Sequence, residues 1–344
     1  MALAVIITTL AVRMHTNSGF TGASLVTLMS FGKILSGVVM FYTKLETSIG
    51  AIARIKVFND TVMPEDKDEE DTIPVESWPQ HGIIELKEVS ASYNTDNQSG
   101  GTPTLALRDI TLTIASGEKL AVCGRTGSGK SSMIALLLKL LDPMPENTAD
   151  IMIDEIPLSQ IDRSTLRQRV IAIPQDAVFL PEGSSFRENL DPFYEATSVQ
   201  CREILEVVEA WPLVEQKGGL DGEMAADTLS QGQKQLFSLG RAVLKRRIRV
   251  AQNPPHDGGI LLLDEVSSSV DHNTERLMQR VIAAEFKSYT VVAISHHLEM
   301  IMEFDTVIIM DTGRIVEVGN PRVLASKGTA TRFGELLKAG NLQD

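Results

Sequence analysis

One stretch of the sequence has the residue types needed to hold a chain of phosphates. Residues 124–131 read GRTGSGKS, which matches the pattern G-x-x-x-x-G-K-[ST]. Glycines let backbone amides turn toward phosphate oxygens, and the N-terminus of a following helix adds partial positive charge. We expect Lys130 to reach the β- and γ-phosphates and Ser131 to ligate Mg²⁺. The expected nucleotide-binding residues of this loop are Gly124, Arg125, Thr126, Gly127, Ser128, Gly129, Lys130, Ser131 and Ser132.

A second pattern supplies two carboxylates at the end of an apolar run. Residues 260–263 are followed by Asp264 and Glu265. We expect Asp264 to hold Mg²⁺ through water and Glu265 to polarise the attacking water as general base. Strands that end in acidic residues are common, so this pattern is specific only together with the phosphate loop. The guanine-reading pattern N-K-x-D is absent from the sequence, which argues against a GTPase.

A serine and a glycine at 229–233, LSQGQ, precede a predicted helix over 234–244. Such residues at a helix N-terminus form an anion-binding cap, although an ordinary N-cap is the alternative. The pentapeptide resembles L-S-G-G-Q, the signature of ATP-binding cassette (ABC) proteins, with Gln231 in place of a glycine. In that family the signature contacts ATP held by a partner cassette. The resemblance assigns this role to Ser230, Gln231, Gly232 and Gln233.

The remaining elements of the ABC family follow in the expected order. Gln175 resembles the glutamine that senses the γ-phosphate, Asp271 the D-loop aspartate, and His296 the switch histidine that orients phosphate and water. His297 stands where the family usually has arginine. Tyr93 resembles the aromatic residue that stacks on adenine, although it could be a buried strand tyrosine. The resemblance implies a catalytic set of Lys130, Gln175, Glu265 and His296, and a Mg²⁺ set of Ser131, Gln175 and Asp264.

The resemblance extends beyond these motifs. Residues 183–192 are similar to the helical subdomain of the C subfamily, the multidrug-resistance-associated group, and 45–49 and 53–56 to its linkage from the final transmembrane helix. The segment before Ile260 is similar to insertions in fungal members. We therefore expect a C-terminal fragment or truncated product: the end of a second transmembrane domain plus a second cassette. Second cassettes of this subfamily often have an altered signature, so the substitution at Gln231 fits the resemblance.

These residues need a parallel sheet with helices around it. Strand-length apolar runs at 260–263 and 290–294 alternate with helical stretches, and 311–313 signals a hairpin between 307–310 and 315–318. We predict an α/β fold, a P-loop NTPase cassette with a RecA-like core. An antiparallel layer near Tyr93 and a helical subdomain over about 176–241 complete it. Residues 246–259 are predicted to form a polar surface loop.

The N-terminal region differs in composition. Residues 20–42 are mostly apolar and long enough to span a bilayer, with Lys33 expected to face a bundle interior or cavity. A soluble amphipathic helix is the alternative. Basic residues Lys44, Arg54 and Lys56 follow, which places the C-terminal end in the cytoplasm. No basic residue precedes the apolar run at 3–12, which argues against a signal peptide. We predict a transmembrane-domain fragment over 1–58, an acidic linker over 59–81 and the cassette over 82–344.

Composition limits the partners. The net charge of −13 argues against nucleic acid, and two distant cysteines, Cys123 and Cys201, form no disulfide framework or metal motif. We expect ATP and Mg²⁺ as cofactors, and a second cassette, transmembrane domains and a plasma or vacuolar membrane as partners. The predicted function is ATP hydrolysis that powers export of amphipathic or conjugated small molecules. A nucleotide-sensing channel regulator, a soluble ABC ATPase of DNA repair or translation, and an inactive truncated product remain alternatives.

Overall fold

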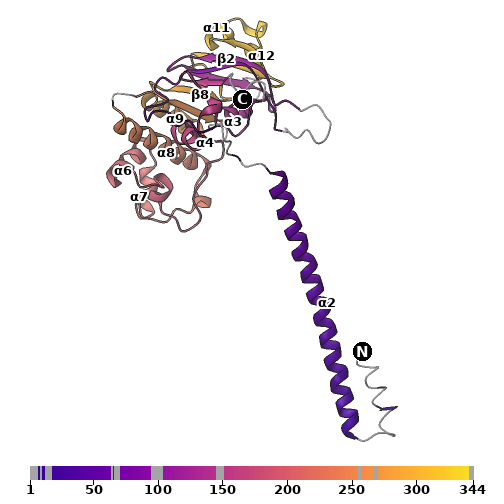
Figure 1. The fold of residues 1–344 in the computed structure, drawn as a ribbon. Helices are drawn as coiled ribbons and strands as arrows, with labels where there is room; N and C mark the ends of the chain where they lie inside the picture. Colours follow the sequence, from indigo (N-terminus) through magenta and orange to yellow (C-terminus); the bar gives the residue numbers. More distant parts are fainter. Residues whose placement is uncertain are drawn as a thin grey trace. The chain divides into compact units, whose positions relative to one another are not determined.

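The computed structural model describes residues 7, 10, 11, 18–62, 65, 70–93, 104–144, 151–254, 257–266 and 270–340. The chain divides into two units, Met1–Lys67 and Asp68–Asp344 (Figure 1). The run at 3–12 lies almost entirely outside the described residues.

The first unit contains one long helix, α2, over Ser18–Thr61. Its 44 residues correspond to about 66 Å at 1.5 Å per residue, roughly twice the thickness of a hydrocarbon core. The stretch Val26–Thr61 has the length and composition of a membrane span, with a mean hydropathy of 1.4. Its large apolar side chains are exposed, Phe31 and Phe41 among them. The predicted span 20–42 lies within this helix.

The second unit is built on a six-stranded sheet in the order β10-β9-β3-β8-β7-β6. Five of these strands are parallel, and β10 pairs with β9 as the predicted antiparallel hairpin. The strands are β3 (Lys119–Gly124), β6 (Ile171–Ile173), β7 (Ile260–Asp264), β8 (Thr290–Ile294), β9 (Thr306–Asp311) and β10 (Arg314–Gly319).

The apolar runs form buried strands because both faces of this sheet are covered. Along β7, Leu261 and Leu263 pack into the core shared with the helical subdomain, whereas Ile260 and Leu262 pack into the core shared with the second sheet. Successive strand side chains point to opposite faces, so a strand buried on both sides has no polar alternation.

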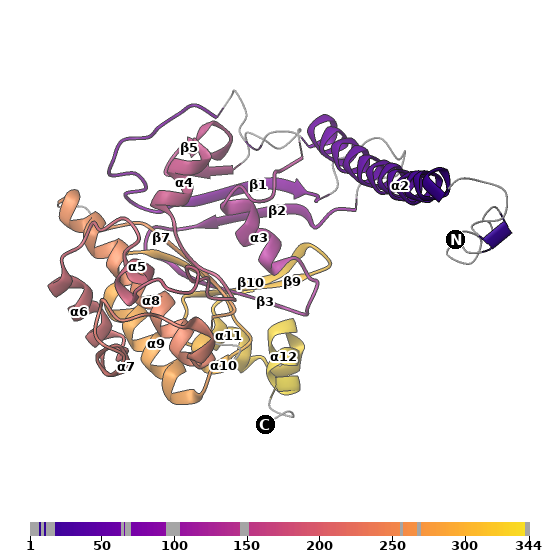
Figure 2. The same ribbon diagram turned by 90° about the horizontal axis from the view of Figure 1, so that it is seen from below.

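The second sheet is antiparallel, in the order β2-β1-β4-β5. As predicted, it lies next to Tyr93, because β1 ends two residues earlier. Figure 2 shows α3 between β1 and β2 on one side and β3, β9 and β10 on the other. The elements are β1 (Ile84–Ala91), β2 (Leu107–Ile114), β4 (Ile151–Ile153), β5 (Ile156–Pro157) and α3 (Lys130–Leu137).

The remaining helices surround the sheets, with α6, α7, α8 and α9 grouped on one side (Figure 1). Their bounds are α4 (Arg163–Arg169), α5 (Phe186–Leu190), α6 (Ser198–Val207), α7 (Trp211–Gln216), α8 (Gln231–Gln252), α9 (His272–Glu285), α10 (Leu298–Ile301), α11 (Pro321–Ser326) and α12 (Arg332–Gly340). Short 3₁₀ turns in the described part of the chain occupy Leu158–Gln160, Ala226–Thr228 and Gly328–Ala330.

The predicted loop at 246–259 is wrong over its first half, because α8 continues to Gln252. Its basic residues bond to protein groups. Arg246 pairs with Glu285 and Asp257 at 2.9 and 2.7 Å. Arg249 donates to the carbonyls of Arg169 and Pro79. A polar run whose partners are distant in the sequence cannot be distinguished from a surface loop by composition.

Candidate nucleotide-binding site

The phosphate loop connects β3 to α3 in a conformation that requires glycine. Gly124 has φ 152°, and a Cβ there would lie 2.4 Å from the carbonyl oxygen of Met310. Gly129 has φ 101°, and its Cβ would lie 2.9 Å from the oxygen of Ala106. The backbone N–H of Gly313 donates to the carbonyl of Ser128 at 2.9 Å. The β9–β10 hairpin therefore supports the loop from outside.

Lys130 lies at the end of this loop and is only 5% exposed. Its Nζ donates to the carbonyls of Gly124 at 3.0 Å and Arg125 at 3.3 Å. The same nitrogen lies 3.9 Å from Oε1 of Glu265. The loop thus holds one ammonium group close to the point where the predicted general base lies.

The predicted magnesium ligands Ser131 and Asp264 are in contact. The Ser131 hydroxyl donates to Oδ1 of Asp264 at 3.3 Å. Burial raises the pKa of Asp264, the hydrogen bond from Ser131 opposes that rise, and the neighbouring Glu265 charge adds to it. A hydroxyl and a carboxylate oxygen are ligands that Mg²⁺ accepts, and a divalent cation here would favour the ionised carboxylate. The two residues therefore fit the ion that the sequence predicts.

Glu265 and His296 face one another across the ends of β7 and β8. Oε1 of Glu265 lies 3.1 Å from Nε2 of His296. Glu265 has φ 47°, a conformation uncommon for residues other than glycine, and its N–H donates to the carbonyl of Ile294 at 3.1 Å. The backbone turn directs the carboxylate toward both His296 and Lys130. A carboxylate in this position can polarise a water molecule, and the imidazole can orient it.

Tyr93 lies at the surface, with 62% of its area exposed. Its hydroxyl donates to the Ser132 hydroxyl at 3.2 Å, which places the ring beside the first turn of α3. The alternative of a buried strand tyrosine is therefore wrong. An exposed ring next to the phosphate loop has the geometry of a stacking surface for a base.

Gln175 lies just after β6 and has a different environment. Its backbone carbonyl accepts a hydrogen bond from the Gln235 amide at 2.5 Å. Within the described residues, its exposed side chain makes no hydrogen bond to Ser131 or Asp264. Its role as a magnesium ligand stays a prediction.

The signature residues start α8 and lie next to the N-terminus of α9. Ser230 caps α8, and Ser230 and Gln233 form a reciprocal capping box. A Cβ on Gly232 would lie 3.4 Å from the side chain of Thr274 and 3.8 Å from Asp271. Asp271 caps α9, and its hydrogen bonds from Thr274 and Asn273 lower its pKa. The signature thus contacts the D-loop helix of its own chain.

Two supporting residues escaped sequence reasoning. Gln235 is 2% exposed and fixes the loop that carries Gln175, and Gly313 supports the phosphate loop through its N–H. Both contacts join segments far apart in the sequence. The sequence offers one weak signal, for Gln235. A polar residue in a predicted helix needs a hydrogen-bond partner if the helix face that carries it is buried.

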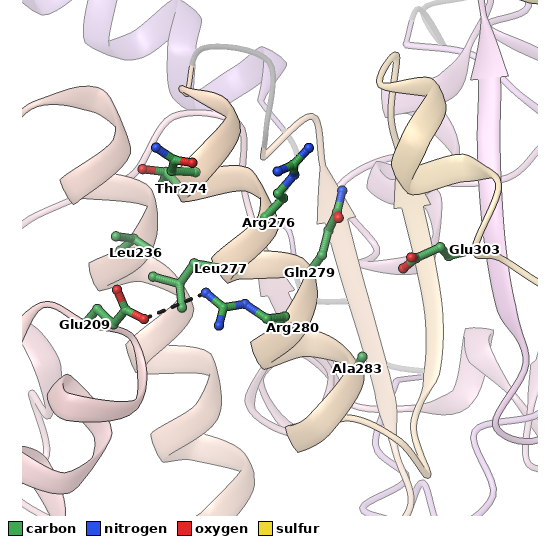
Figure 3. A pocket seen from close by; sticks show the side chains of 10 residues that line it. Glu209, Leu236, Thr274, Arg276, Leu277, Gln279, Arg280, Ala283 and Glu303 are labelled. Carbon is green, nitrogen blue, oxygen red and sulfur yellow. Dashed lines mark ion pairs between the residues drawn. The ribbon is translucent and has the colours of Figure 1, made fainter.

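A cavity of about 680 Å³ lies along α9, apart from the phosphate loop. Figure 3 shows Arg276, Gln279 and Arg280 on α9, with Glu303 on one side and Glu209 on the other. Arg280 and Glu209 approach to 3.8 Å, and both are exposed. Exposed pairs of this kind contribute little energy, and none of the predicted nucleotide ligands lines the cavity.

The two sheets, the phosphate loop at the end of β3 and the paired carboxylates at the end of β7 define an ABC cassette with a P-loop NTPase fold. Residues 107–268 match the family model described as ABC transporter, and this part of the chain is an ABC transporter domain. A solved structure of a bacterial Atm1-family ABC exporter with ATP bound has the same fold. The TM-score is 0.69 at 22% identity, with 93% of this chain and 52% of that chain covered.

Fungal relatives have higher sequence identity. The chain is 56% identical to the ABC-type transporter braE of Annulohypoxylon truncatum, over 98% of this chain and 24% of that protein. It is 50% identical to the ABC transporter FGM5 of Gibberella zeae, over 98% of this chain and 23% of that protein. The chain therefore spans about a quarter of the length of these relatives.

Proposed function

We propose that this chain binds Mg²⁺-ATP and hydrolyses it as the second nucleotide-binding cassette of a C-subfamily exporter. ABC transporter cassettes are ATPases in general. The observation that carries the proposal is the cluster at the phosphate loop, where Lys130 and His296 lie 3.9 and 3.1 Å from the same oxygen of Glu265. The adjoining Ser131–Asp264 pair supplies the oxygen ligands for magnesium.

The proposed reaction uses the chain's own residues in distinct roles. Lys130 binds the terminal phosphates, Tyr93 stacks on adenine, Glu265 accepts the proton of the attacking water, and His296 orients that water. Magnesium neutralises phosphate charge when it is bound at Ser131 and Asp264, with Gln175 completing the set.

A partner cassette completes the proposed site. The signature of this chain contacts α9 through Gly232 and Thr274, whereas the phosphate-loop cluster involves Lys130 and Glu265. ATP held by the loop would thus meet the signature of another cassette. Gln231 adds a side chain where the family usually has glycine, so a partner with an L-S-G-G-Q signature would pair better than a second copy.

The regions outside the core of the cassette have proposed roles too. Residues 1–58 would be the end of a transmembrane domain, 59–81 a linker and 82–344 the cassette, with 176–241 as helical subdomain. The apolar helix α2 and the transporter relatives support a cytoplasmic cassette fastened to a plasma or vacuolar membrane. The cargo would be amphipathic or conjugated small molecules.

The test is phosphate release by the full chain in detergent, with and without a partner cassette that carries L-S-G-G-Q. We expect slow hydrolysis alone and faster hydrolysis with the partner. Glu265→Gln should abolish turnover but retain ATP binding, because it removes the base and leaves the phosphate and magnesium contacts. The control is Glu303→Gln, in the cavity along α9. Retained turnover in Glu265→Gln would refute the base, and full activity without a partner would refute the pairing. ATP binding without hydrolysis in the wild type would favour a nucleotide sensor.

A further inference from the structure

Glu275 is a buried carboxylate whose nearest cations are histidines. It lies in the first turn of α9 and is 5% exposed. Its Oε1 is inaccessible and accepts no hydrogen bond within the described residues. Nδ1 of His297 lies 3.1 Å from this oxygen. Nδ1 of His272 lies 3.8 Å from Oε2, but the His272 side chain is 84% exposed.

The carboxylate needs a positive partner. A buried charge without one is strongly destabilising, although the N-terminus of α9 offsets part of that cost. Among the described residues, no lysine or arginine lies within 4.0 Å of Glu275. Exposed pairs contribute little, so His297, at 31% side-chain exposure, is the effective partner and His272 the weak one.

His297 also sits beside the catalytic cluster. It follows His296, whose Nε2 faces Glu265 at 3.1 Å. Its N–H donates to the Ser295 hydroxyl at 3.0 Å, and its carbonyl accepts from the N–H of Ile301 at the end of α10. Its backbone is therefore fixed within the switch loop, and its side chain reaches α9.

We propose that His297 is a positioning residue whose protonated ring, paired with Glu275, holds the switch loop against α9 and so sets the position of His296. The pair joins two functional segments, because the D-loop residue Asp271 caps the N-terminus of α9. The charged and titratable groups around it are Glu275 and His272 from α9 and His296 from its own loop. The inference rests on the proposed ATPase function.

The pair makes hydrolysis depend on pH in a defined way. The attraction between His297 and Glu275 requires a proton on the imidazole, so it is lost when rising pH removes that proton, whereas an arginine would keep its charge. The ATP-binding contacts at Lys130 and Tyr93 do not involve this pair. Loss of the pair should therefore lower kcat for ATP hydrolysis and leave KM for ATP nearly constant.

The test compares His297→Arg, whose charge is permanent, with wild type. Steady-state ATPase of the full chain with its partner cassette is measured from pH 6 to 8.5. The ratio of wild-type to His297→Arg kcat should fall about threefold to fivefold across this range, as expected for a half-buried pair. His297→Gln should have low kcat throughout. In the Glu275→Gln background, the advantage of arginine should disappear. His272→Gln is the matched control and should follow wild type.

Several outcomes would overturn the inference. Parallel pH profiles for wild type and His297→Arg would exclude a role for the histidine charge. Wild-type kcat in His297→Gln would exclude positioning. If wild type binds ATP by calorimetry but releases no phosphate at any pH, the proposed ATPase function fails and this inference with it. Normal hydrolysis with identical profiles refutes this inference alone.

Discussion

Glu70 provides a sharp test of how the cassette is held together. Its side chain is 6% exposed and lies 3.0 Å from Nζ of Lys139 and 2.6 Å from Nε of Arg163. Lys139 follows α3, the helix of the phosphate loop, and its carbonyl accepts from Arg163 at 2.8 Å. Thr72 forms a bridge with Ile161. Glu70 is thus held at the C-terminal end of the phosphate-loop helix, and Thr72 is held against Ile161.

The cations around Glu70 stabilise its ionised form. Burial raises its pKa, but hydrogen bonds from Arg163 and Lys139 outweigh burial, so the pKa is lowered from 4.5. For Lys139, burial has the greater effect and lowers the pKa despite Glu70. The lysine therefore offsets part of what the carboxylate gains. The pair stabilises the fold by less than the Glu70 shift alone would suggest.

Glu70→Gln should destabilise the cassette. Breaking a buried pair costs about 3–5 kcal/mol. Glutamine retains an acceptor, and Arg163 keeps Asp142 at 2.7 Å, so we expect a smaller loss. A value of about 2 kcal/mol corresponds to a Tm lower by roughly 4–8 °C for a domain of this size. Tryptophan fluorescence measures it selectively, because Trp78 and Trp211 are the two tryptophans of the sequence and both lie in the second unit.

The matched control is Glu85→Gln. Glu85 pairs with Lys87 at 3.4 Å, but these side chains are 33% and 62% exposed, so its Tm should match wild type. Because the pKa of Glu70 is lowered, its stabilisation is complete above pH 4.5 and is lost as pH falls through the lowered pKa. The Tm difference between wild type and Glu70→Gln should therefore shrink in acid. Equal Tm values for Glu70→Gln and Glu85→Gln at neutral pH would refute the reasoning.

Three further predictions concern nucleotide and membrane. Lys130→Ala should weaken ATP binding strongly in calorimetry, because a charge-assisted phosphate contact is lost; unchanged affinity would contradict the site. Tyr93→Ala should weaken binding by about 0.5–1.5 kcal/mol while Tyr93→Trp does not, and equal behaviour of the two would exclude stacking. Lys33→Leu should ease membrane insertion, since a central lysine costs about 2.5–3.5 kcal/mol; release of wild type by alkaline carbonate would contradict a spanning helix.

Short sequence patterns predicted the parts of the fold in which the backbone conformation restricts the residue type. The glycines at 124 and 129 occupy conformations with φ 152° and 101°, and Asp311–Gly313 joins the two strands of the predicted hairpin. In these places the backbone conformation restricts the residue type directly. The fold class followed from the alternating apolar runs, whereas the order of the strands in the sheet was not predicted.

The features that the sequence did not predict depend on contacts between residues distant in the sequence. Arg246 and Arg249 resemble loop residues in the sequence, yet their partners lie on α9 and on segments near 79 and 169. Glu70 was part of an acidic stretch predicted as a linker, and nothing local in the sequence distinguishes it from the other acidic residues of that stretch. Partners distant in sequence leave no periodic signal. The pairing of His297 with Glu275 escaped sequence reasoning for the same reason.

Helix α9 is in contact with both the signature and the switch loop. Asp271 caps the helix, and in its first turn Thr274 faces Gly232 of the signature and Glu275 pairs with His297. Its N-terminus therefore contacts both the segment expected to meet a partner's ATP and the loop expected to act on the chain's own ATP. Because both contacts are made within one helical turn, we expect a partner that shifts the signature to affect His296 through α9 and the Glu275–His297 pair.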